Sequence, residues 1–86
     1  MADIKFEQYL ILYDYERVFC TNNAVSLKDC LVQYLDYTGN NRPLLRKALN
    51  GMETEQEMVE LINAMTTYTI EHIFKIDKVI YEAKSK

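Results

Sequence analysis

Residues that could carry chemistry are scarce in this chain. His72 is the only histidine, and Cys20 and Cys30 are the only cysteines. Nucleophilic catalysis needs a nucleophile beside a base, and His72 has no serine, cysteine or aspartate partner in a recognised motif. One histidine and two separated cysteines also fall short of the ligand set of a zinc site. We therefore predict a protein that is not an enzyme, with no catalytic residues, no metal site and no cofactor.

The densest acidic run spans residues 53–60, where Glu53, Glu55, Glu57 and Glu60 occur close together. A calcium loop needs oxygen donors around a glycine turn, whereas this run lies within an expected helix. Carboxylates in the first helical turn interact favourably with the positive helix end, and the others form a solvated face. The run therefore predicts a helix rather than a metal site.

A basic segment without acids lies in the middle of the chain. Its cations, Arg42, Arg46 and Lys47, are candidate ligands for an anion, although cations near a helix C-terminus explain them equally well. The order helix, glycine, basic helix superficially resembles a helix-turn-helix. However, Asn40 stands where that unit buries an apolar residue, Pro43 stiffens its second helix, and a net charge of −3 repels nucleic acid. We do not expect nucleic-acid binding.

The strongest functional signal is an alternation of apolar residues near the N-terminus. In a strand, successive side chains point to opposite faces, and here both faces are apolar because Leu10 and Leu12 fall between the tyrosines. A chain this short cannot cover both faces of a sheet with helices. Core packing of the tyrosines is the alternative. We predict an exposed protein-binding surface formed by Tyr9, Ile11, Tyr13 and Tyr15.

The 86 residues, 49% hydrophobic and 27% charged, are typical of one globular domain spanning residues 1–86. No apolar run approaches the roughly 18 residues of a membrane span. Residues 1–7 mix acidic, basic and apolar side chains, unlike a signal peptide. We therefore expect no membrane association and a cytoplasmic location, with Cys20 and Cys30 as small buried residues rather than a disulfide. The core is thin, which favours self-association.

The elements that position these residues begin with a hairpin. The apolar pattern predicts a strand at residues 4–13 and another at residues 18–21, joined by a tight turn at residues 14–17. Asn22 and Asn23 are expected to end the second strand, because asparagine favours turns.

The clearest helix is predicted at residues 26–38. The Ser26 hydroxyl can cap the backbone of Asp29, and Gly39 can end the helix in a left-handed conformation. The apolar spacing i, i+3, i+4, i+7 and i+8 gives one buried stripe. The stripe consists of Leu27, Cys30, Leu31, Tyr34 and Leu35.

Two further helices follow. One begins near Pro43, where a missing N–H is harmless, and ends at Gly51. The other begins with the capping box Thr54-x-x-Glu57. The first of these two helices is expected to direct Leu44, Leu45, Ala48 and Leu49 to the core.

The last segment, residues 66–83, is rich in β-branched and aromatic residues, which favours a strand. Ile70, His72 and Phe74 would share one face, and a bulge or turn near residues 77–78 would explain a later shift in the alternation. A helix is the alternative, because apolar residues here also occur at helical spacing.

Together these elements predict an α+β fold: a small antiparallel sheet, made of an N-terminal hairpin and a C-terminal strand, with three helices packed on one face. A short acidic chain rich in Tyr and Ile resembles the small accessory proteins of bacteriophages and mobile elements. That resemblance implies a protein that binds and blocks a host factor. Our first hypothesis is accordingly a non-enzymatic protein-binding module or inhibitor that uses the tyrosine face or a sheet edge. The alternatives are a small oligomer that sequesters an anion or nucleotide, and a DNA-binding regulator.

Overall fold

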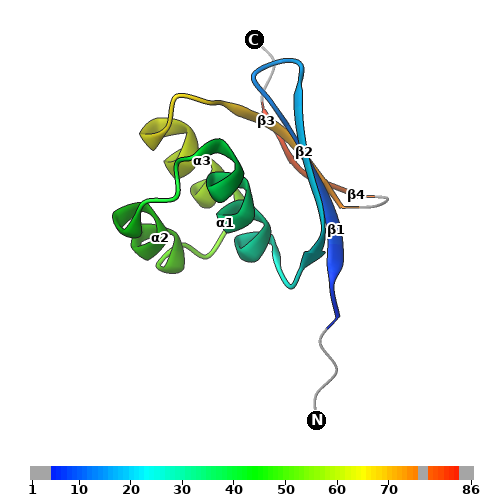
Figure 1. Cartoon of the computed structure of the whole chain (residues 1–86), viewed down its shortest axis with the longest axis horizontal. Coiled ribbons are helices and arrows are strands. Elements are labelled where there is room, and N and C mark those ends of the chain that lie inside the picture. The colour runs from blue at the N-terminus through cyan, green and yellow to red at the C-terminus, as the bar shows by residue number, and fades with distance from the viewer. Residues whose placement is uncertain (1–4, 76–77, 84–86) are drawn as a thin grey trace.

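The structure, a computed structural model, describes residues 5–75 and 78–83. In this part of the chain it confirms the α+β architecture, with helices inserted between an N-terminal and a C-terminal hairpin (Figure 1). The expected strand start at residue 4 and the expected turn residue Asp77 lie outside the described residues. The strands β1 (Glu7–Tyr13), β2 (Arg17–Ala24), β3 (Ile70–Lys75) and β4 (Lys78–Glu82) form one antiparallel sheet in the order β2-β1-β3-β4.

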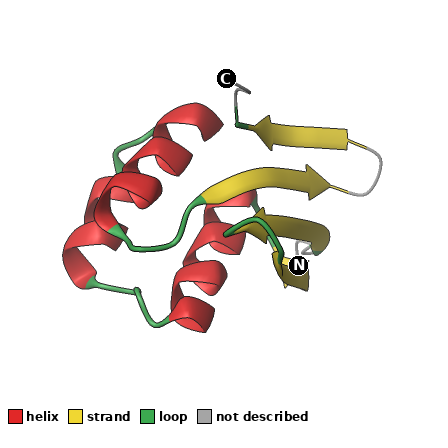
Figure 2. Ribbon diagram, turned by 90° about the horizontal axis from the view of Figure 1, so that it is seen from above, coloured by secondary structure: helices red, strands yellow, loops and turns green. Residues whose placement is uncertain are grey.

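Three helices, α1 (Leu27–Thr38), α2 (Pro43–Asn50) and α3 (Glu55–Met65), lie on the same side of this sheet (Figure 2). Their starts follow the predicted caps. The Ser26 hydroxyl accepts the N–H of Asp29 at 3.1 Å. The capping box at the start of α3 is also present. No helix in the described ranges is both long and apolar enough to cross a membrane.

The turn between β1 and β2 is tight, as predicted, although it contains no glycine. Asp14 and Tyr15 adopt positive φ angles of 50° and 68°. Two contacts with the start of the β3 region hold this strained backbone: the Asp14 carboxylate accepts the N–H of Thr69 at 2.9 Å, and the Glu71 carboxylate accepts the N–H of Tyr15 at 2.9 Å. Long-range contacts therefore support this turn, in addition to the local bond from the Glu16 N–H to the Asp14 carbonyl at 2.8 Å.

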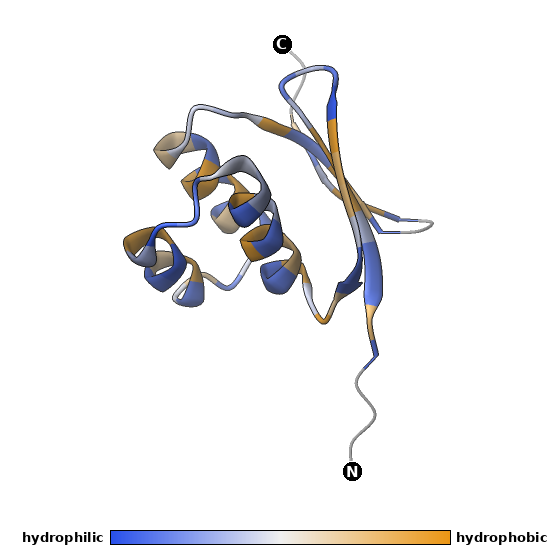
Figure 3. Cartoon of the chain, in the orientation of Figure 1, coloured by the Kyte–Doolittle hydropathy of each residue, from blue (hydrophilic) through white to orange (hydrophobic). Residues whose placement is uncertain are grey.

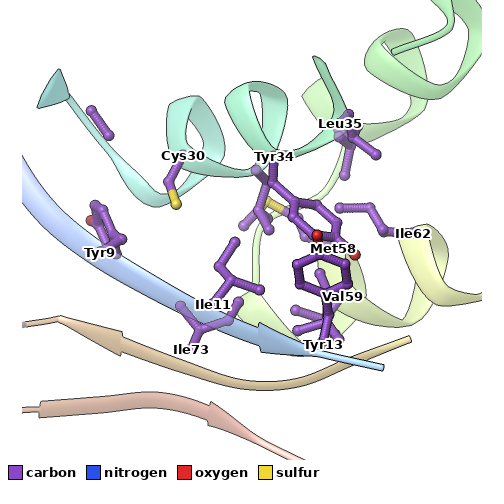
Figure 4. Packing of buried hydrophobic residues seen from close by; sticks show 14 of the residues in the cluster. Tyr9, Ile11, Tyr13, Cys30, Tyr34, Leu35, Met58, Val59, Ile62 and Ile73 are labelled. Carbon is purple, nitrogen blue, oxygen red and sulfur yellow. The ribbon is translucent and has the colours of Figure 1, made fainter. Parts of the chain in front are cut away.

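The helices cover the face of β1 that carries Tyr9, Ile11 and Tyr13, which are 5%, 0% and 4% exposed. Figure 4 shows these side chains extending from the strand toward α1, where Tyr34 meets Tyr13 edge-to-face at 5.1 Å between ring centroids. Our prediction that these three residues form an exposed surface is wrong. With this face covered, the core contains three large side chains and their aromatic contacts. Covering the face of Leu10 and Leu12 instead would bury less apolar area and no aromatic ring of β1.

Three smaller predictions also need correction. Strand β2 continues through Asn22 and Asn23 to Ala24, which pairs with Glu7, and the two asparagines lie in the bulge where the register with β1 shifts. Leu44 is 77% exposed, so the buried residues of α2 are Leu45 and Leu49, with Ala48 half-buried beside them. In the sheet, Cys20 is exposed rather than buried. That exposure follows from its position opposite Leu10, on the face away from the helices.

The Tyr34 hydroxyl is the weak point of this core. The residue is fully buried, and its hydroxyl has no hydrogen-bond partner among the described residues. Burial raises the pKa of Tyr34 above its ordinary value. An unsatisfied buried hydroxyl is destabilising by about 1–3 kcal/mol relative to a satisfied one.

We predict that Tyr34→Phe leaves the free energy of unfolding unchanged or raises it by up to about 1 kcal/mol, since it removes an unpaired polar group. Tyr9→Phe is the matched control. Its hydroxyl donates to the Glu7 carboxylate at 2.8 Å, so this variant should lose about 1 kcal/mol. Urea denaturation measures both changes. A loss of about 1 kcal/mol or more in Tyr34→Phe would contradict an unpaired hydroxyl.

Candidate functional site

The sheet has a second face that no helix covers in the described part of the chain (Figures 1 and 2). Side chains directly opposite each other on neighbouring antiparallel strands lie on the same face. The strand register therefore places two rows of side chains across all four strands of this face. One row is Cys20, Leu10, Phe74 and Val79, and the other is Val18, Leu12, His72 and Glu82. We call these eight residues the open face.

The open face is mostly apolar and partly accessible. Val18 and Val79, on the two outer strands, are 49% and 51% exposed, and Leu10, Leu12 and Phe74 are half-buried by their neighbours. Figure 3 shows hydrophobic residues along the strands of the sheet, which has helices on only one side. Scattered exposed apolar residues are ordinary, but a contiguous apolar patch indicates a contact surface.

A shallow hollow of about 650 Å³ lies along the first row of the open face. Its lining includes the apolar residues Leu10 and Phe74 and the β1 and β2 residues Gln8, Cys20 and Asn22. A lining that combines apolar side chains with amide groups suits a side chain inserted by a protein partner.

The polar end of the open face lies on β3 and β4. Nε2 of His72 is 3.3 Å from a carboxylate oxygen of Glu82 on the opposite strand. The imidazole also stacks on the Phe74 ring, with 5.6 Å between ring centroids and an interplanar angle of 10°. This arrangement fixes the orientation of both rings. The stacked rings of His72 and Phe74 form one aromatic surface, and the Glu82 carboxylate lies at its polar edge.

The open face brings a histidine and a cysteine to the same side of the sheet, but not together. His72 lies on β3 and Cys20 on β2, with β1 between them, which separates their backbones by roughly 10 Å. A nucleophile and its base must approach hydrogen-bond distance. Among residues 5–75 and 78–83, no cluster of three or more His, Cys, Asp or Glu side chains could hold a metal ion.

The predicted site residues are dispersed in the fold. Of the tyrosine set only Tyr15 is exposed, at 92%, and it lies at the tip of the β1–β2 turn. Arg42, Arg46 and Lys47 are all exposed on α2 or at its start, on the helical layer rather than on the sheet. The N–H of Arg46 is bonded to the Arg42 carbonyl at 3.0 Å, as expected for the first turn of a helix. The structure does not bring these cations to the hollow on the open face.

Most of the open face was missed by sequence reasoning. The alternation identifies Leu10 and Leu12 as an apolar set, but the prediction of an exposed tyrosine surface leaves these leucines on the core side of the strand. The simple alternation of residues 70–74 predicts Phe74 and His72 on the same face as Ile70. A bulge opposite the end of β1, where Leu12 pairs with His72 and Tyr13 with Ile70, places Ile70 on the covered face instead.

Comparisons of this chain with protein-family models, with curated proteins and with solved structures find no match. Its function is therefore argued from its own surface.

Proposed function

We propose that this protein is a small, non-enzymatic protein-binding module and that the open face is its contact surface. The observation that carries the proposal is the apolar band across all four strands, made by Leu10, Leu12 and Phe74 with Val18 and Val79 at its sides. The proposed activity is that of an accessory or inhibitor protein, which acts by occupying a surface of its partner. The proposal includes a cytoplasmic location, which the free thiols of both cysteines support.

The chemistry of the open face favours a protein partner over a nucleic acid. Its eight residues include no lysine or arginine, and Glu82 adds a negative charge. Binding to nucleic acid depends on contacts between cationic side chains and phosphates. The net charge of −3 on this chain instead repels the phosphates. Apolar contact with an aromatic anchor is instead typical of protein interfaces.

The decisive variant is Leu12→Lys combined with Val79→Lys, which places two charges on the open face without touching the covered side. We expect each replacement to weaken partner binding by about 2 kcal/mol or more, roughly thirty-fold in Kd. The domain should stay folded, because Val79 is half exposed and a lysine at Leu12 can extend its ammonium group to water. Immobilised protein is used to capture partners from a cell lysate, with binding quantified on the captured protein.

Leu44→Lys is the control for each single replacement, since it puts one lysine in place of an exposed leucine of the helical layer. A partner that is captured by the wild type and by the control, but not by the double variant, supports the proposal. Capture that survives in the double variant places the contact surface elsewhere. Equal loss in Leu44→Lys would show that added charge alone abolishes binding.

A further inference from the structure

The two edges of the sheet are built differently. The described sheet ends at β2 on one side and at β4 on the other. An edge strand exposes unpaired backbone groups, and proteins protect such edges by short strands, charges and bulges. Strand β4 has these features: it is five residues long, begins with Lys78, ends with Glu82, and pairs with β3 through a bulge.

Strand β2 shares only one of them, a bulge between Thr21 and Ala24 where its register with β1 shifts. It is eight residues long, and after Arg17 it contains neither a charged residue nor a proline. The N–H of Asp14 bonds to the carbonyl of Thr69 next to β3, so the carbonyl of Tyr13 in the same peptide plane points to β2. Backbone groups alternate along a strand. Val18 and Cys20, which lie in the regular part of β2 before the bulge, therefore direct their N–H and C=O groups outward from the sheet.

The side chains around this edge are apolar as well. Phe19 packs on Tyr37 of α1 at 5.2 Å between ring centroids, yet the Tyr37 side chain is 64% exposed. On the opposite side of the sheet Val18 is 49% exposed. An uncharged strand edge flanked above and below by accessible apolar groups is suited to pairing with another strand.

We propose that β2 pairs antiparallel with β2 of a second copy of this chain, forming a continuous eight-stranded sheet in a two-fold symmetric dimer. A two-fold axis at Cys20 sets Cys20 of each copy opposite the other, with Val18 opposite Asn22. The N–H and C=O groups of the two Cys20 residues then bond to each other. The second copy fits this edge because its own β2 brings no charge between Val18 and Ala24, so two chains of net charge −3 meet along neutral strands. The Tyr37 rings of both copies come to flank the junction.

This dimer is independent of the proposed partner binding, because pairing at the edge leaves the open face uncovered and joins the faces of both copies into one surface. It makes a specific geometric prediction. Opposed residues of a hydrogen-bonded antiparallel pair have Cα atoms about 5.5 Å apart, within the range of a disulfide. The two Val79 residues of such a dimer are separated by seven inter-strand spacings, about 34 Å in total.

The experiment oxidises the purified full chain with diamide and follows the disulfide-linked dimer on non-reducing gels. Cys20 serves as the probe, since Cys30 is fully buried and burial raises the pKa of its thiol to about 12. We expect the wild type to crosslink rapidly at low protein concentration. The Cys20→Ser, Val79→Cys variant, with a thiol of comparable exposure on the other edge, should crosslink at least tenfold more slowly. Equal rates would overturn the proposal, because random encounter would then explain both products.

Sedimentation equilibrium of Val18→Pro provides the second test. This change removes an outward N–H and leaves the ladder with β1 intact, whereas Val18→Thr keeps that N–H. We expect dimer affinity to fall at least tenfold in Val18→Pro and little in Val18→Thr. Equal affinity in the two variants, or a wild type that is monomeric at every concentration, contradicts edge pairing. If Val18→Pro does not melt cooperatively, the crosslinking rates alone decide. The Leu12→Lys, Val79→Lys variant should lose partner capture and keep the crosslink, so that failure of either proposal is recognised separately.

Discussion

The Ile11→Ser, Tyr13→Lys double variant is expected to unfold the domain. Both residues lie on the covered face of β1 and are 0% and 4% exposed. Removing the Ile11 side chain leaves a cavity and a buried hydroxyl, and a lysine at position 13 buries a charge without a partner. Together these changes should exceed about 5 kcal/mol, which is comparable with the whole stability of a small domain. Far-UV circular dichroism during heating measures the result.

Tyr15→Lys is the control for this variant. It belongs to the same alternating series, but its side chain is 92% exposed in the turn, so its melting temperature should stay close to that of the wild type. A folded Ile11→Ser, Tyr13→Lys protein with cooperative melting would contradict the assignment of these residues to the core. It would restore the tyrosine face as a candidate surface.

The second large effect is expected for Leu31→Ala in α1. Leu31 is 0% exposed and lies in the cluster beneath the sheet, so its truncation should lower the free energy of unfolding by about 2–5 kcal/mol. Chemical denaturation with urea gives the value. Leu44→Ala makes the same substitution at an exposed leucine and should change stability by no more than about 0.5 kcal/mol. Equal losses in the two variants would show that Leu31 is not packed as described.

The helices could be predicted from the sequence because their signals are local. Ser26 and the Thr54–Glu57 capping box lie within one turn of the helix ends that they fix, and Gly39 adopts the left-handed conformation expected at the end of α1, with φ of 78°. The apolar stripe of α1 needs no information from elsewhere in the chain. Tyr34 and Leu35, predicted for the core, are fully buried.

The choice of sheet face could not be made in the same way. Both faces of β1 are apolar, and a period of two residues says nothing about which face the helices cover. Here the covered face is the one whose Tyr13 ring fits against Tyr34 and Tyr68, two residues distant in sequence. The prediction that one apolar face stays uncovered by helices was correct, but the tyrosines were assigned to it wrongly.

The open face was hidden by bulges. Simple alternation puts Ile70 with His72 and Phe74, but the register changes between Leu12 and Tyr13 on β1 and again between Ile73 and Phe74 on β3. A bulge depends on how two strands pair and leaves no local signature in a chain with few glycines. The row from Cys20 to Val79 could therefore not be assembled from the sequence.

The central claim is that the open face, and not the tyrosine face, contacts the partner. Carbene footprinting, which labels accessible side chains without regard to their chemistry, tests it on the free protein and on its complex. We expect Leu12, Val18 and Val79 to be labelled in the free protein and protected in the complex, while Ile11 and Tyr13 stay unlabelled in both. Strong labelling of Ile11 and Tyr13 in the free protein, or a complex that leaves Leu12 and Val79 fully labelled, would contradict the account.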